Sequence, residues 1–251
     1  MRKKKTVKSI KAARAKKTTP RSKAKPRSSA KTRESAASRR ARAKKILAAL
    51  KKAYPDADCA LNHTNALELL VATILSAQCT DERVNIVTAD LFKRYKTPAD
   101  YAGETPAAFQ AQIKSTGFFR QKTRSILGAC AAVVTEHGGK VPQTMESLTR
   151  LPGVARKTAN VILGTWFGKN EGIVVDTHVG RLASRMALTW TSRDGKDAVK
   201  IEADLMQIIP RPQWTFFAHA MTWHGRRVCT ARKPACDRCT VSAWCPSAFS
   251  V

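Results

Sequence analysis

Four cysteines near the C-terminal end constrain the fold of this chain more than any other feature. Cys229, Cys236, Cys239 and Cys245 fall within seventeen residues and are separated by six, two and five residues. An iron–sulfur cubane needs one thiolate at each of its four iron corners, and a compact loop with one Cys-x-x-Cys pair and two flanking cysteines supplies them. The spacing therefore predicts a [4Fe–4S] cluster that orders the end of the chain.

Zinc is the main alternative ligand for these cysteines, because four thiolates also make a closed structural zinc site. Zinc loops usually supply their ligands as two short Cys-x₂₋₄-Cys pairs, whereas only Cys236 and Cys239 form such a pair here. Unliganded cysteines are the third interpretation, although the segment is poor in the apolar residues that would order it without a metal. The spacing favours iron–sulfur over zinc.

The other three cysteines, Cys59, Cys79 and Cys130, lie among aliphatic residues, where a free cysteine usually behaves as a small hydrophobic residue. The odd total of seven cysteines, with no signal-peptide pattern at the start, argues against a disulfide framework and a secreted protein. No run of eighteen uncharged apolar residues is present, so no transmembrane helix is expected. We expect an intracellular protein.

The positive charge is concentrated at the N-terminus. The formal net charge is +28, and residues 1–45 contribute +19 of it through twenty Lys or Arg against one acid, Glu34. Residues 1–37 contain too few apolar side chains to offset the entropy cost of ordering, so we expect a disordered tail that binds phosphates without sequence preference. A solubilising tail and an organelle transit peptide are the alternatives.

The remainder of the chain has the periodicity of many short helices, which predicts an all-α fold. Residues 65–78 are apolar on nearly every side, which predicts a buried helix with Asn65 as its N-cap. Glycine and proline separate the segments, and we interpret Pro98 as one of these helix breakers. Strand signal is confined to residues 173–175. The expected helices cover residues 40–54, 65–78, 81–94, 105–114, 119–136, 144–150, 156–167, 177–187, 197–208 and 212–224.

Residues 147–163, SLTRLPGVARKTANVIL, predict two short helices joined by a turn at Pro152-Gly153. Free amides at the start of the second helix form an anion site of the kind that a sequence-independent DNA binder uses for backbone phosphate. A Pro-Gly turn between helices is common by itself. The pair Arg156-Lys157 at the start of the second helix favours the phosphate-binding interpretation.

Lys157 and Asp176 are the candidate catalytic pair. A lysine at a helix N-terminus beside another cation lies where its ammonium form is disfavoured, and a neutral amine can attack a sugar carbon and form a Schiff base. Phosphate binding is the alternative role of Lys157. Asp176 ends a short apolar segment just before a helix, so it is either a catalytic carboxylate or only an N-cap.

The run LPGVARKTANVIL, the segment VDTHV and the four-cysteine spacing, in this order, resemble endonuclease III. This is a family of bifunctional DNA glycosylases and abasic-site lyases in the helix–hairpin–helix superfamily. The similarity extends over residues 40–247. An adenine-specific relative lacks a lysine at the position of Lys157, so the lysine in this chain favours the pyrimidine enzyme.

The resemblance implies a six-helix barrel domain at residues 59–170, which contains the helix–hairpin–helix. It also implies an iron–sulfur cluster domain built from residues 38–58 and 171–251. The expected substrate is an oxidised or ring-saturated pyrimidine in duplex DNA, extruded into a pocket because a stacked base cannot be reached. Lys157 would be the nucleophile, and Asp176 the carboxylate that assists it.

The resemblance also implies roles in DNA binding. Gln78, in SAQCTD, would fill the gap left by the extruded base, and Phe118, in KSTGFFRQK, would wedge into the base stack. Each is otherwise an ordinary loop residue. The other predicted DNA contacts are Gly153, Val154, Ala155 and Arg156 in the hairpin and Arg232 and Lys233 in the cysteine loop, and the predicted pocket residues are Asp81 and His178.

One position departs from the family pattern. The hairpin commonly reads Gly-x-Gly, and here the second glycine is Ala155. If that position needs a positive φ, alanine costs on the order of 1 kcal/mol, and its methyl group crowds the phosphate. We therefore expect the hairpin to bind backbone less well than one with glycine at position 155.

Two other functional classes compete with the repair enzyme. One is a non-enzymatic helix–hairpin–helix DNA-binding protein with a structural metal cluster, and the other is an electron carrier. The presence of both Lys157 and Asp176 argues against the first, and no docking feature for a redox partner supports the second. We expect a monomer that binds damaged duplex DNA, does not bind membranes and acts at the bacterial nucleoid in the cytoplasm, with organelle targeting by the tail as an alternative.

Overall fold

The structure is a computed structural model and describes residues 34–250. Within this range the chain forms eleven α-helices and contains no β-strand, which confirms the predicted all-α fold. The apolar residues 173–175 lie in an extended loop rather than a strand. Nearly all of the tail predicted at residues 1–37 lies outside the described residues. No helix within the described range is long and apolar enough to cross a bilayer.

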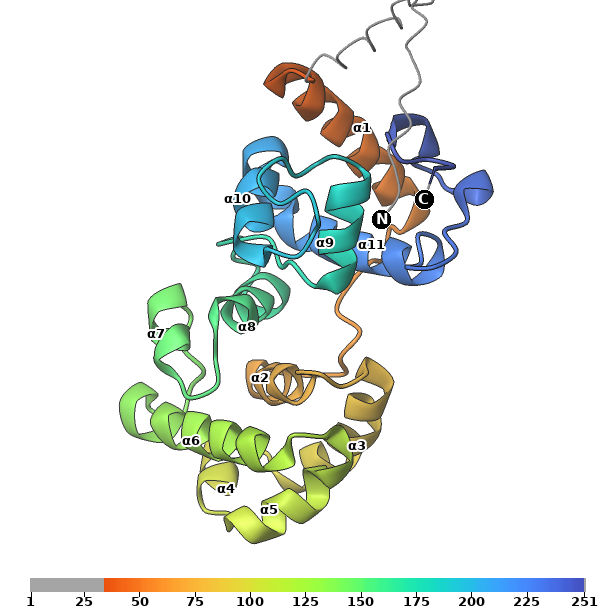
Figure 1. The fold of residues 1–251 in the computed structure, drawn as a ribbon. Helices are drawn as coiled ribbons and strands as arrows, with labels where there is room; N and C mark the ends of the chain where they lie inside the picture. Colours follow the sequence, from red (N-terminus) through yellow and green to blue (C-terminus); the bar gives the residue numbers. More distant parts are fainter. Residues whose placement is uncertain (1–33, 251) are drawn as a thin grey trace, which may run out of the picture. The chain divides into compact units, whose positions relative to one another are not determined.

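Ten of the eleven helices in the described range correspond to the ten predicted ones, in the same order, and α4 has no predicted counterpart (Figure 1). Short 3-10 or π segments, labelled η1 to η5, connect or extend several of them. The α-helices are α1 (Ala36–Ala53), α2 (Ala66–Leu75), α3 (Asp81–Arg94), α4 (Pro98–Ala102), α5 (Pro106–Ile113), α6 (Phe119–His137), α7 (Met145–Arg150), α8 (Arg156–Val161), α9 (Thr177–Arg185), α10 (Ala198–Ile208) and α11 (Trp214–Arg227).

Two clusters of buried side chains divide residues 35–250 into two lobes. One cluster runs from Leu61 to Leu163 and is built by α2 to α8; we call it the central lobe. The other combines residues 43–57 of α1 and its following loop with residues 173–241, and we call it the terminal lobe. In Figure 1 the central lobe is drawn below the terminal lobe, and α8 lies where they meet.

The ends of several helices follow from local capping. Asn65 caps α2 as predicted, because its side chain accepts a hydrogen bond from the Glu68 amide. Helix α1 begins at Ala36, four residues before the predicted start at residue 40, and the Ser35 side chain accepts from the Ser38 amide at its first turn. The alanines and arginines that follow Ser35 are good helix formers, which accounts for the earlier start.

The interpretation of Pro98 as a helix breaker is wrong. Pro98 is the first residue of α4, where its missing N–H costs no helical hydrogen bond. Thr97 precedes it as the N-cap, and the side chains of Thr97 and Asp100 form a reciprocal capping box. Proline, which ends a helix when it lies in its interior, starts a helix here because Thr97 and Asp100 cap the first turn.

Two ion pairs are among the polar contacts that join the lobes. Arg156 of α8 forms an ion pair with Glu202 of α10, with 3.0 Å between Nη2 and Oε1. Asp81 of α3 forms an ion pair with Arg226 of α11. Both contacts lie beside residues that the sequence selected for the functional site, so the junction between the lobes also arranges that site.

Candidate functional site

The hairpin between α7 and α8 depends on a glycine at position 153. Gly153 has φ +76°, and a Cβ atom added there would lie 2.4 Å from the Cβ of Ser125. The next residue, Val154, is only 4% exposed and packs into the core of the central lobe. The hairpin is therefore a tight left-handed turn at Gly153, anchored by one buried valine and seated against α6.

The expectation of backbone strain at Ala155 is wrong. Ala155 has φ −86° and ψ 169°, an extended conformation that any residue adopts, and it serves as the N-cap of α8. The left-handed turn falls at Gly153 instead, two residues earlier. Because position 155 needs no positive φ, alanine costs the hairpin no strain there.

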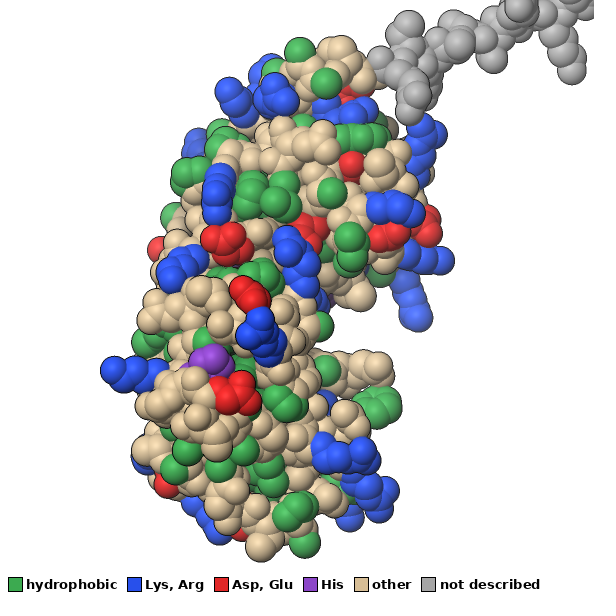
Figure 2. All heavy atoms as spheres, turned by 90° about the vertical axis from the view of Figure 1, so that its left-hand side faces the viewer, with side chains coloured by type: hydrophobic (Ala, Val, Ile, Leu, Met, Phe, Trp, Pro, Cys, Tyr) green, Lys and Arg blue, Asp and Glu red, His purple; other side chains and the backbone are tan. Residues whose placement is uncertain are grey.

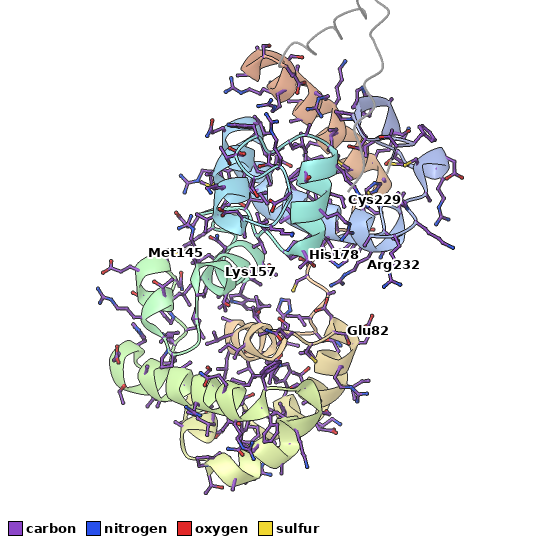
Figure 3. The ribbon with its side chains drawn as sticks, viewed as in Figure 1. Glu82, Met145, Lys157, His178, Cys229 and Arg232 are labelled. Carbon is purple, nitrogen blue, oxygen red and sulfur yellow. The ribbon has the colours of Figure 1, made fainter. Side chains whose placement is uncertain are left out.

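Lys157 and Asp176 line the same hollow. Lys157 is the exposed second residue of α8, and Asp176 directly precedes α9. The other charged side chains lining this hollow are Arg181, Arg185, Asp194 and Lys196. Figure 3 shows Lys157 on α8 and His178 at the start of α9, both near the junction of the lobes. The two candidate catalytic side chains come from segments on opposite sides of that junction.

The Asp176 carboxylate is held by two hydrogen bonds. Its Oδ1 atom accepts from the Val179 amide at 2.7 Å, so Asp176 is the N-cap of α9. Its Oδ2 atom accepts from the Thr222 hydroxyl of α11 at 3.2 Å. Capping and a role in the hollow are therefore compatible, because the cap fixes the direction of a carboxylate that still lines the hollow beside Lys157.

Arg156, a predicted DNA contact, is held by the terminal lobe. Its guanidinium donates to Glu202 at 3.3 Å from Nε and 3.0 Å from Nη2. The Asn160 side chain donates to the same carboxylate at 3.0 Å. Arg156 thus braces the start of α8 against α10, and the neighbouring Lys157 is the cation at this helix start that projects into the hollow.

Gln78 and Phe118 line a second hollow, on the central lobe, together with Gly153. Both have left-handed backbones, with φ 52° and φ 46°, and Phe118 is 64% exposed. Exposed, left-handed residues that are not glycine are uncommon in proteins. The structure brings these two predicted DNA contacts to one surface beside the hairpin, and separately from the hollow that contains Lys157.

Asp81 and His178, the predicted pocket residues, line neither of these hollows. Asp81 accepts a hydrogen bond from Arg226, and the Nδ1 atom of His178 accepts from Arg181 at 3.2 Å. Burial lowers the pKa of His178, and the charges of Arg181 and Arg226 lower it further against the opposing effect of Asp176. Arg226 therefore forms an ion pair with one predicted pocket residue, Asp81, and lowers the pKa of the other, His178.

Arg232 and Lys233 are exposed in the loop between the first two cysteines of the C-terminal set. The loop is closed by the Thr230 hydroxyl, which donates to the Lys233 carbonyl at 2.7 Å. Figure 2 shows Lys and Arg side chains on both lobes, on either side of an indentation between them. The two exposed cations are free to meet an anionic partner.

Cys229, Cys236, Cys239 and Cys245 line one small pocket in the terminal lobe. Two polar side chains approach their sulfurs: Arg185 Nη1 donates to Cys229 Sγ at 3.3 Å, and His224 Nε2 lies 3.3 Å from Cys239 Sγ. Within residues 34–250 no three His, Cys, Asp or Glu side chains converge tightly enough to hold a single ion. Four cysteine side chains around one pocket suit a cubane, which takes one cysteine ligand at each of its four corners.

His224 is a contact that the sequence interpretation missed. It is completely buried, and burial lowers its pKa to about 4, so the ring is neutral near pH 7. Its Nδ1 atom lies 2.9 Å from the Tyr54 hydroxyl. One tautomer satisfies both neighbours, with Tyr54 donating to Nδ1 and Nε2–H donating to the Cys239 sulfur. The helix predicted at 212–224 contains two histidines, His219 and His224, and the position of His224 one turn after Ala220 and Met221 was the available signal.

Comparison with known proteins shows the family of this chain. Residues 71–211 match the family described as HhH-GPD superfamily base excision DNA repair protein, and residues 229–245 match the iron–sulfur binding domain of endonuclease III. Endonuclease III of Synechocystis sp. is 52% identical over 207 residues, covering 82% of this chain and 93% of the relative.

Two solved structures are similar throughout the lobes. One is described as a non-covalent endonuclease III–DNA complex and the other as a trapped endonuclease III–DNA covalent intermediate. Each is 39% identical, with a TM-score of 0.77, and the match covers 83% of this chain and 96% of the solved chain. The family match, the shared fold and the four cysteines lead to one conclusion: this chain belongs to the endonuclease III family of helix–hairpin–helix base excision repair proteins and carries a [4Fe–4S] cluster.

Proposed function

We propose that this protein removes oxidised or ring-saturated pyrimidines from duplex DNA and then cuts the strand at the abasic site by β-elimination. The general class follows from the family: the protein is a DNA glycosylase and abasic-site lyase of base excision repair. The observation that carries the residue assignment is that Lys157 and Asp176 line one hollow. A relative described as a trapped covalent intermediate with DNA supports covalent chemistry.

In the first step, the Lys157 amine attacks C1′ of the extruded nucleotide. A carbon–nitrogen bond forms, the glycosidic bond breaks, and the base leaves with a proton. Asp176, oriented by Val179 and Thr222, stabilises the positive charge that develops on the sugar and assists proton transfer. The sugar ring then opens: the C1′–O4′ bond breaks, O4′ takes up a proton, and a protonated Schiff base remains between Lys157 and C1′.

In the second step, the Schiff base acidifies the C2′ proton. Loss of that proton drives β-elimination, which breaks the bond between C3′ and the 3′ phosphate oxygen and nicks the strand. Water then hydrolyses the imine and returns Lys157 to its amine form. The protein therefore supplies one nucleophile and one oriented carboxylate for both bond cleavages.

The remaining predicted residues bind the substrate in this proposal. Gln78 occupies the gap left by the extruded base, and Phe118 separates the neighbouring base pairs, since both are exposed beside the hairpin. Backbone phosphates contact the amides from Gly153 to Arg156 and the exposed side chains of Arg232 and Lys233. Asp81 and His178 are assigned to the wall of the base pocket.

The cluster and the lobes complete the proposal. Cys229, Cys236, Cys239 and Cys245 would hold the cluster, and the four bonds from their sulfurs to iron would order the loop that carries the two cations. We assign residues 59–170 to a barrel domain, and residues 38–58 and 171–251 to the cluster domain. The protein acts as a monomer on damaged chromosomal DNA at the bacterial nucleoid.

The deciding experiment is borohydride trapping with the full-length chain on a duplex that contains one oxidised thymine. The wild type is expected to give a covalent adduct with borohydride and a nicked strand without it. Lys157→Gln should lower both by more than about 10³-fold, because the nucleophile is lost. Lys140→Gln is the matched control, since it removes one exposed positive charge outside the hollow.

Each other outcome has a definite meaning. An adduct of equal yield in Lys157→Gln would move the nucleophile to another residue. DNA binding by wild-type protein with neither adduct nor nick would favour the non-enzymatic alternative. Retention of the brown colour of the cluster shows that the variants are folded.

A further inference from the structure

Lys122 in α6 is a buried cation that the proposed chemistry does not use. Its side chain is only 4% exposed, and among the described residues it has no carboxylate partner. Burial lowers the pKa of the Lys122 ammonium, and a nearby cysteine, Cys79, opposes that shift. Burying a charge without an opposite charge is unfavourable. The buried ammonium of Lys122 therefore needs hydrogen-bond acceptors that stabilise it in place of a carboxylate.

Two backbone carbonyls accept hydrogen bonds from this ammonium. Lys122 Nζ donates to the Leu75 carbonyl at 2.8 Å and to the Thr116 carbonyl at 2.8 Å. Leu75 is the last residue of α2, where carbonyls lack helical partners and a cation is favoured by the helix dipole. Thr116 lies forty-one residues after Leu75 and is the last residue of the 3-10 segment η1 (Lys114–Thr116), just before Gly117. A single side chain thus joins two segments that are distant in sequence.

Gln78 and Phe118 lie in the loops that directly follow these two segments. Gln78 follows Leu75 by three residues, and Phe118 follows Thr116 by two. The backbone amide of Lys122 also donates to the Phe118 carbonyl at 3.1 Å. Lys122 lines the hollow beside both residues, so it lies between the two loops and underneath their exposed tips.

The backbones of Gln78 and Phe118 are in a conformation that the surrounding structure must stabilise. Gln78 and Phe118 have positive φ angles, which are unfavourable for residues with a Cβ atom. Such conformations persist only where the surrounding structure holds them, and they cluster at functional sites. The hydrogen bonds of Lys122 constrain the chain within three residues of each tip.

We propose that Lys122 is a positioning residue that fixes Gln78 and Phe118 at a set separation, so that the two side chains enter the duplex as one unit around the extruded nucleotide. This inference rests on the proposed function, in which Gln78 fills the gap and Phe118 enters the stack. Lys122 itself contacts neither base nor reacting sugar. Its effect is on the extrusion of a paired and stacked nucleotide.

The test compares two substrates with Lys122→Met, which keeps the length of the side chain and removes its hydrogen-bond donors. Single-turnover base removal from a paired oxidised thymine is expected to fall by about 10-fold or more, because misplaced loops no longer stabilise the extruded nucleotide. Cleavage at a preformed abasic site should fall by less than about 3-fold, since no base must be unpaired or unstacked. The neighbouring Thr123→Val is the matched control, because Thr123 is buried and its hydroxyl has no partner within the described residues.

A double-mutant cycle separates positioning from general loss of stability. In a chain that already carries Gln78→Ala and Phe118→Ala, Lys122→Met should have little further effect on base removal, because the side chains that it positions are absent. If Lys122→Met yields no folded brown protein, Lys122→Gln, which keeps part of the donor capacity, is compared in the same way. An equal loss on both substrates, or a full effect in the double-alanine background, would overturn the proposal.

Failure of the proposed function would look different. Wild-type rates of base removal by the Gln78→Ala, Phe118→Ala chain would remove those two residues from the mechanism, whatever Lys122 does. A reduced rate in that chain, together with an unaffected Lys122→Met protein, would reject the positioning role alone.

Discussion

At the scale of single residues, one glycine determines the shape of the hairpin that we propose as a phosphate site. The turn at Gly153 has a positive φ and lies directly against Ser125, so both its backbone and the surrounding space exclude a side chain. Ala155 is exposed and extended, and it has neither restriction. Two positions of the Gly-x-Gly pattern therefore have different physical requirements, although the pattern presents them as equivalent.

This difference predicts opposite outcomes for two substitutions. Gly153→Ala is expected to lower the free energy of unfolding by about 1–3 kcal/mol and to weaken DNA binding, because the methyl group displaces α6 or the turn. Ala155→Gly should change the free energy of unfolding by less than about 1 kcal/mol, since glycine is an acceptable N-cap. Urea unfolding and DNA titration measure both. Tighter DNA binding by Ala155→Gly would show that the alanine methyl group, rather than backbone strain, limits contact with phosphate.

At the scale of elements, the loop between α9 and α10 forms one wall of the hollow that contains Lys157. Asp194, Gly195 and Lys196 of this loop line the hollow. The loop is held at two places. The buried Asp204 carboxylate accepts hydrogen bonds from Thr189 and from the residues after it, and Gly195 packs closely on Gly180 of α9.

The glycine contact predicts that a methyl group on α9 displaces this wall. A Cβ atom at Gly180 would lie 2.3 Å from the Gly195 carbonyl oxygen. Gly180→Ala is expected to cost about 1–3 kcal/mol of stability and to slow strand cleavage, although alanine is the better helix former. The measurements are urea unfolding and single-turnover nicking of an abasic duplex.

Gly103→Ala is the matched control for this substitution. An added Cβ there lies 3.4 Å from its nearest neighbour, and the backbone φ is −82°. Its stability should stay within about 0.5 kcal/mol of the wild type. If the two alanine variants behave alike, the close contact between the loop and α9 has no part in shaping the hollow.

At the scale of the whole molecule, one buried histidine and two partly buried ones connect folding to pH. Burial lowers the pKa of His178, His219 and His224, and the value for His224 falls to about 4. In the unfolded chain a histidine has a pKa of about 6.5. Below that pH the unfolded chain binds more protons than the folded protein, so these three residues make stability rise with pH and reach its full value above about pH 6.5.

The free energy of unfolding is therefore expected to fall as the pH is lowered from 7 to 5. His219→Gln should make this fall shallower by up to about 1.4 kcal/mol per pH unit, which is the contribution of one group. His219 suits the test because it lies 3.2 Å from the Thr165 hydroxyl, a partner that glutamine can also reach. Urea unfolding across this range measures the slope. A slope that is unchanged in His219→Gln would contradict the assignment.

The sequence by itself determined the features that depend on neighbouring residues. Helix periodicity predicted the all-α fold, Asn65 gave a correct cap, and the spacing of four cysteines identified the cluster loop. These signals are local because caps, turns and a ligand loop are completed within a few residues. Even so, the local rule for proline failed at Pro98, where the Thr97 and Asp100 capping pair reversed its meaning.

Only the tertiary structure decided which distant residues meet. No spacing indicated that Arg156 would turn to Glu202 or that His224 would reach a cysteine sulfur. The family resemblance implied that Lys157 and Asp176 act together, but only the packing of the two lobes gave them one hollow. The same holds for Lys122, whose two acceptors lie forty-one residues apart in the chain. Such contacts depend on how whole helices pack around two cores, and the pattern within one helix records which face is buried, but not which partner covers it.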